Sequence, residues 1–111
     1  MEHKTQKVPP PIRRALRSLG EDVVTWRKLR GLTQAQLADR SDVSRGTLVR
    51  LEKGDGGVST ENLLRVLRGL GILENLSRAS DPYESDVGRL RSGQRLPERV
   101  RPQVLRVPSD G

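Results

Sequence analysis

Residues 32–54, LTQAQLADRSDVSRGTLVRLEKG, decide the fold of this chain. Thr33 and Gln36 form a capping box, which marks the start of a helix, and Ser44 is placed to cap a second helix. The apolar positions that should face inward recur at helical spacing: Leu37, Ala38, Leu48 and Leu51. Residues 42–43 separate the two patterns, and the stretch closes on a glycine. Residues 55–57, Asp-Gly-Gly, are expected to form a flexible loop. The sequence therefore predicts two short amphipathic helices joined by a tight turn.

A longer helix is predicted upstream, over Ile12–Arg30. Its apolar residues recur at steps of three and four: Leu16, Leu19, Val23, Trp26 and Leu29. Gly31 is a natural stop for this helix, whereas Gly20 is expected to weaken its early part. Residues 1–11 end in three prolines and are expected to form a disordered or extended arm.

Two further helices are predicted downstream. Ser59 or Thr60 caps a fourth helix, whose residues 63–70 are apolar on a wide face. A short fifth helix is expected over residues 72–79. Residues 71–79 are the candidate dimer element, because their apolar residues exceed what a small bundle can cover. Residues 81–111 are expected to form a basic tail, interrupted by prolines.

These elements predict an all-α domain of four to five helices over residues 12–80, between the arm and the tail. The chain has 111 residues and is 32% hydrophobic, so its core is modest and dimerisation is a plausible source of extra burial. It has no cysteine, which excludes disulfides and thiolate metal sites. Its one histidine, His3, lies in the arm, and no catalytic constellation is visible. We therefore expect no enzyme activity, no cofactor and no metal.

The positive charge of the chain lies in its two flanks. The net charge is +7, yet residues 19–85 carry ten Lys/Arg against ten Asp/Glu. Residues 1–18 carry five Lys/Arg against one acid, and residues 86–111 carry six arginines against three acids. Basic arms can bind phosphates by releasing counterions, although they can also remain solvated. No apolar run approaches the roughly 18 residues of a membrane span, and no signal peptide is evident. We expect a cytoplasmic, nucleoid-associated protein without a membrane partner.

Two capped helices with a tight turn are typical of a helix-turn-helix, whose second helix enters the major groove of DNA. The N-terminus of the first of these helices suits a phosphate, and arginine on the second can read guanine. The expected DNA contacts are Thr33, Gln34, Ser44, Arg45, Gly46, Thr47, Arg50 and Lys53. The alternative is a helical hairpin within a small bundle, with solvated arginines.

The same residues resemble the lambda-repressor-like, Xre-type helix-turn-helix family, over about Leu19–Leu70. The resemblance implies a compact bundle of four or five helices that binds palindromic operators as a homodimer. It implies that Gln34 contacts phosphate, and that Arg27 pairs with Glu52 as a structural ion pair. Asp42 departs from the family, which usually has glycine at this turn. It should tolerate the left-handed conformation, but it adds a negative charge near the interface.

Together with this domain, Asp81–Pro102 resembles small regulators of the HipB type. That resemblance implies the autoregulating antitoxin of a HipBA-like toxin-antitoxin module, with a HipA-type kinase as the toxin partner. The residues alone show an arginine-rich extension with a few apolar anchors, which is typical of segments that fold on a partner.

We therefore expect a sequence-specific transcriptional repressor that binds double-stranded DNA. Two alternatives stay open. One is a protein-interaction adaptor built on a helix-turn-helix scaffold. The other is a sequence-independent nucleic-acid binder that acts through its basic flanks.

Overall fold

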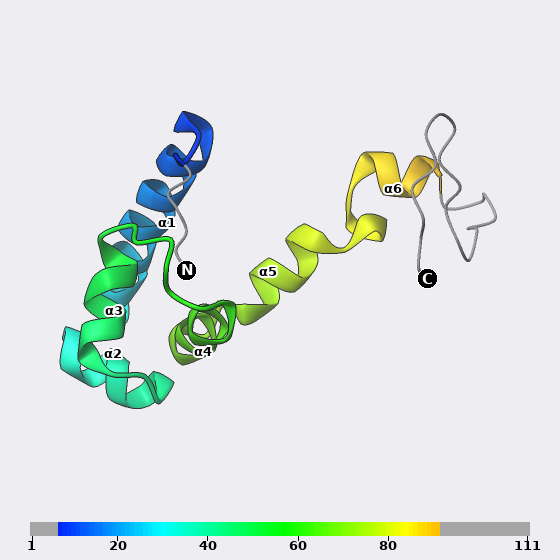
Figure 1. The fold of residues 1–111 in the computed structure, drawn as a ribbon. Helices are drawn as coiled ribbons and strands as arrows, with labels where there is room; N and C mark the ends of the chain where they lie inside the picture. The colour runs from blue at the N-terminus through cyan, green and yellow to red at the C-terminus, as the bar shows by residue number, and fades with distance from the viewer. Residues whose placement is uncertain (1–6, 92–111) are drawn as a thin grey trace, which may run out of the picture. The chain divides into compact units, whose positions relative to one another are not determined.

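The computed structural model describes residues 7–91, which form helices joined by turns and loops and contain no strand (Figure 1). This confirms the all-α fold class. The chain divides into two compact units, residues 1–76 and residues 77–111, and each is described by itself. The expected disorder of the termini concerns mainly residues 1–6 and 92–111, which lie outside the described residues.

Six α-helices and one 3₁₀ helix follow one another along the described chain. They are α1 (Pro10–Leu29), α2 (Gln34–Ser41), α3 (Arg45–Glu52), α4 (Thr60–Leu70), α5 (Leu73–Ser80), η1 (Pro82–Glu84) and α6 (Asp86–Leu90). The helix α1 begins at Pro10, two residues before the expected Ile12. Prolines are accepted there because the first turn of a helix leaves its N–H groups without intrahelical partners. Gly31, just beyond α1, has a φ of +71°.

Three helices, α2, α3 and α4, begin at the caps that the sequence predicts. The Thr33 hydroxyl accepts a 3.1 Å hydrogen bond from the Gln36 N–H, and the Gln36 side-chain oxygen accepts a 2.9 Å bond from the Thr33 N–H. This is the predicted capping box at the start of α2. Ser44 caps α3 and Ser59 caps α4 in the same way, each accepting from a backbone N–H three residues on.

A single core joins the first four helices. The four residues expected to face inward are all at most 4% exposed. They pack with residues of α1 and α4, which complete the core cluster: Val23, Val66 and Leu70. Because α2 packs on both α3 and α4, and α3 packs on α1, this core fixes α3 relative to its neighbours.

Gly20 does not weaken α1, contrary to the expectation. The helix continues through Gly20, which is buried against the end of α3. A Cβ at this position would lie 2.5 Å from the carbonyl oxygen of Glu52 and 2.8 Å from that of Leu51. Only glycine lets the backbones of α1 and α3 approach this closely, so burial outweighs its poor helix propensity.

Asp42 adopts the left-handed conformation between α2 and α3, with φ 60° and ψ 43°. Its carboxylate accepts a 3.0 Å hydrogen bond from Arg65 of α4, which offsets part of its charge. The turn therefore forms without glycine, as expected.

The second unit is described over residues 77–91. The helix α6 has only five residues and is capped by Ser85, which accepts a 2.9 Å bond from the Gly88 N–H. The sequence patterns did not predict this short helix. Its apolar residues are largely exposed: Val87 at 65% and Leu90 at 82%.

Candidate nucleic-acid interface

A buried carboxylate organises one edge of the helix-turn-helix. The Glu52 side chain, 5% exposed, lies at the end of α3. Arg27 of α1 donates to it from Nε at 2.7 Å and from a terminal amino group at 3.3 Å. Arg27 also donates a 3.0 Å bond to the Leu32 carbonyl, just before α2. One guanidinium thus ties α1 both to α3 and to the segment that leads into α2.

Gln34 extends this network to the N-terminus of α3. Its side-chain nitrogen donates a 2.8 Å bond to Glu52, and its side-chain oxygen accepts a 3.5 Å bond from Arg45. A hydrogen-bonded chain therefore runs from Arg27 through Glu52 and Gln34 to Arg45. Gln34 is half-buried, so its amide is oriented by the protein before any ligand arrives.

The outer face of α3 is polar and open to solvent. The residues exposed there are Ser44, Arg45, Gly46 and Arg50, while Thr47 is half-buried. The Ser44 hydroxyl donates a 2.9 Å hydrogen bond to the Thr47 hydroxyl. Two of the predicted DNA-contacting groups therefore bond to each other in this structure. At Gly46 a Cβ would meet only the Ser44 hydroxyl oxygen, at 3.9 Å, so nothing blocks a close approach to this turn.

Arg50 forms an ion pair with Asp55, which is not among the residues predicted from the sequence. Its Nε donates a 2.8 Å bond to Asp55, whose other carboxylate oxygen accepts a 2.7 Å bond from the Gly57 N–H. The hydrogen bond from Arg50, followed by that from the Gly57 backbone, lowers the pKa of Asp55 below its ordinary 3.8. The sequence Asp55-Gly56-Gly57, expected to be a flexible loop, thus forms an Asx turn. The signal was available, because Asp two residues before glycine favours such a turn.

The remaining predicted contacts lie at the two ends of the motif. Thr33 is exposed at the start of α2, where its hydroxyl is already engaged in the capping box. Lys53 is exposed and forms the C-cap of α3. Gly54 follows with a φ of +84°, and a Cβ there would lie 3.1 Å from the Cα of Arg17. The loop after α3 is therefore packed on α1.

Two other kinds of feature, a metal-binding cluster and a membrane-spanning helix, are absent from the part of the chain that the structure describes. Among residues 7–91, no cluster of three or more His, Cys, Asp or Glu residues could hold a metal ion. No helix within the same range is long and apolar enough to cross a membrane.

The structure joins four of the predicted residues in two hydrogen-bonded pairs, Gln34 with Arg45 and Ser44 with Thr47. No curated protein matches the chain. Residues 25–74, which run from the last turns of α1 to the start of α5, match the model of the helix-turn-helix family.

Proposed function

We propose that this protein is a DNA-binding transcription regulator that reads the major groove with α3. The observation that carries the proposal is the two-sided character of α3. Leu48 and Leu51 are buried in the core, while Arg45 and Arg50 project from the opposite side into solvent. A helix whose apolar face is packed on the core and whose exposed face carries arginines suits base reading in the major groove.

The hydrogen-bonded chain through Glu52 supports the same proposal. Arg45 is tethered to Gln34, and Gln34 to a carboxylate that is itself fixed by Arg27. Holding a base-reading side chain in place reduces the entropy that binding must overcome. The exposed N-terminus of α2 adds N–H groups and a positive dipole end that suit a DNA phosphate.

We further propose repression through a palindromic operator bound by a homodimer. In such complexes the two recognition helices enter successive major grooves about one helical turn apart. The antitoxin role, with a HipA-type kinase toxin as partner and autoregulation of the operon, rests on the sequence resemblance of Asp81–Pro102 together with the domain. The absence of a stable complex with any such kinase would contradict it.

Binding through the basic flanks is the second candidate. Arg13, Arg14 and Arg17 are exposed near the start of α1, where they could contact phosphates without reading sequence. Such binding would show no preferred site, and removal of residues 86–111 or of the α1 arginines would abolish most affinity.

Removing the charges of α3 distinguishes three functions: sequence reading by α3, binding through the basic flanks, and a protein-interaction adaptor. We expect the double variant Arg45→Gln with Arg50→Gln to abolish specific DNA binding. Each base-reading arginine should account for about 1–3 kcal/mol of the binding free energy. The matched control, Arg13→Gln with Arg14→Gln, removes the same charge from α1 and should keep the site preference. If both variants lose affinity equally, the flanks dominate. If neither does while a protein partner is retained, the adaptor is supported.

A further inference from the structure

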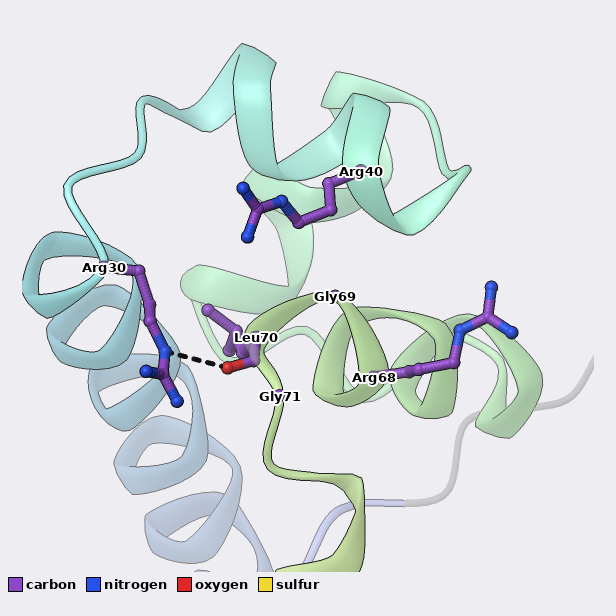
Figure 2. A pocket seen from close by; sticks show the side chains of 6 residues that line it. All are labelled: Arg30, Arg40, Arg68, Gly69, Leu70 and Gly71. Carbon is purple, nitrogen blue, oxygen red and sulfur yellow. Dashed lines mark hydrogen bonds between the residues drawn. The ribbon is translucent and has the colours of Figure 1, made fainter.

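An arginine-lined cleft lies at the carboxyl ends of α1, α2 and α4 (Figure 2). It is open to solvent and has a volume of about 410 Å³. Its lining residues are Arg30, Arg40, Arg68, Gly69, Leu70 and Gly71. No acidic side chain is among them. A Cβ at Gly69 would meet Ser41 of α2, whereas a Cβ at Gly71 would lie 3.4 Å from a terminal amino group of Arg30. Gly71 therefore leaves space beside that amino group.

Arg30 is fixed in place at one wall of the cleft. Its Nε donates a 2.9 Å hydrogen bond to the Leu70 carbonyl, and its guanidinium carbon lies 5.2 Å from the ring centre of Trp26. The bond uses only one of the five N–H donors of a guanidinium. Both terminal amino groups of Arg30 therefore remain available to a ligand. Figure 2 shows Arg40 reaching into the cleft from the opposite wall, whereas the head of Arg68 turns outward at the rim.

Interaction with the carboxyl ends of the helices explains only part of the positive charge of the three arginines that line the cleft. Each helix carboxyl end carries about half a negative charge, whereas each arginine carries a full positive one. Backbone groups already serve these ends: the Gly71 and Ile72 N–H groups donate to carbonyls of α4 at 2.9 Å. The Asp42 and Val43 N–H groups donate to carbonyls of α2 at 3.2 and 3.1 Å. Within residues 7–91, neither the Arg40 guanidinium nor the Arg68 guanidinium has a hydrogen-bond or ion-pair partner.

We propose that this cleft binds a phosphoryl oxyanion between Arg30 and Arg40, with Arg68 adding positive potential at the rim. Two guanidinium groups on opposite walls need a ligand with acceptor oxygens on both sides. A tetrahedral phosphoryl group offers them, whereas a carboxylate presents its two oxygens along one edge. The oxyanion could belong to a small phosphate ester or to the DNA backbone. The site is distinct from the α3 surface, because Arg40 and Gln34 lie near opposite ends of α2.

Trp26 provides a built-in reporter for this site. It is the only tryptophan of the chain, and it lies against Arg30. Inorganic pyrophosphate, titrated into the full-length protein at constant ionic strength, should change the Trp26 fluorescence saturably. Arg40→Gln should weaken this binding at least about tenfold, because it removes charge-assisted hydrogen bonds. Arg40 is exposed, so this variant should fold, and it leaves Trp26 and Arg30 unaltered. Arg65→Gln is the control, because Arg65 of α4 does not line the cleft and is already paired with Glu61 and Asp42. This variant should bind pyrophosphate like the unmodified chain.

DNA binding by the same variants distinguishes the two sources of the oxyanion, a DNA phosphate and a small phosphate ester. If the oxyanion is a DNA phosphate, Arg40→Gln lowers the salt dependence of DNA affinity by about one phosphate contact, and pyrophosphate competes with DNA. If it is a small phosphate ester, Arg40→Gln leaves DNA binding unchanged. The proposal is overturned if pyrophosphate gives no saturable change in Trp26 fluorescence, or if Arg40→Gln and Arg65→Gln weaken pyrophosphate binding alike. Neither result would bear on DNA reading by α3, which is tested separately.

Discussion

Asp55 holds the Arg50 guanidinium through a 2.8 Å hydrogen bond, while the Gly57 N–H holds the other oxygen of the same carboxylate at 2.7 Å. The carboxylate thus links an exposed arginine of α3 to the backbone of the next loop. An arginine buttressed in this way has fewer rotamers to lose when it meets a base.

We expect Asp55→Asn to broaden the base preference at the position that Arg50 contacts. Affinity for unrelated DNA should not fall, because the change also removes a negative charge near the phosphates. Binding to a panel of sites with single base changes measures both effects. Asp39→Asn removes an exposed charge from α2 and is the matched control. An unchanged preference in Asp55→Asn would show that Asp55 does not position Arg50.

The same pair predicts a pH dependence. Because Arg50 and the Gly57 N–H lower the pKa of Asp55 below 3.8, the folded state favours the ionised carboxylate. The resulting stabilisation is present above pH 3.8 and is lost as the pH falls through the lowered pKa. NMR titration of the Asp55 carboxyl should show this pKa, and Arg50→Gln should move it back towards 3.8. A pKa unaffected by Arg50→Gln would contradict the ion pair in solution.

Loss of the buried carboxylate should be costly. Glu52→Gln leaves Arg27, 13% exposed, without its countercharge, and we expect a loss of about 3 kcal/mol in the free energy of unfolding. Urea denaturation measures this loss. The exposed pair of Arg65 and Glu61 is the comparison, and Arg65→Gln should leave stability nearly unchanged. Replacing both Arg27 and Glu52 with methionine should restore much of the stability. Equal losses in Glu52→Gln and Arg65→Gln would refute this account of the network.

Two glycines should respond to alanine in opposite directions. Gly20→Ala would place a Cβ 2.5 Å from the Glu52 carbonyl oxygen, so separating α1 from α3 should cost about 1–3 kcal/mol or more. Gly46→Ala meets open space in a helix and should stabilise the fold by about 0.5–1 kcal/mol. Thermal unfolding of the two variants gives the comparison. A stabilised Gly20→Ala protein would mean that α1 and α3 are not in close contact.

The hydroxyl of Ser41 should be dispensable, unlike that of Ser44. Ser41 is 0% exposed, and its hydroxyl has no hydrogen-bond partner among the described residues. Ser41→Ala should therefore raise the free energy of unfolding by about 1 kcal/mol. Ser44→Ala removes the cap of α3 and should lower it by about 1 kcal/mol. Denaturant unfolding of both variants tests the contrast, and a destabilised Ser41→Ala protein would reveal an unrecognised partner.

Local interactions made much of this fold predictable. The caps at Thr33 and Ser44 and the turn at Asp42 depend on residues within four positions, so the sequence pattern contains them. Gly20 was misjudged because its environment comes from α3, about 30 residues away in the sequence. The arginine cleft could not be foreseen for the same reason, since it gathers the ends of three helices. The sequence pattern does not predict the contact of Asp55 with Arg50, because a glycine-rich stretch favours a flexible loop unless the Asx turn orders it.

Selection from a random DNA library with the full-length protein tests the central claim most directly. At about 150 mM salt, where non-specific phosphate binding is weakened, we predict enrichment of a defined site, two-fold symmetric with half-sites about one helical turn apart. The variant Arg45→Gln with Arg50→Gln should enrich no site, or a different one. A library that shows no preferred sequence with the unmodified protein would contradict sequence reading by α3.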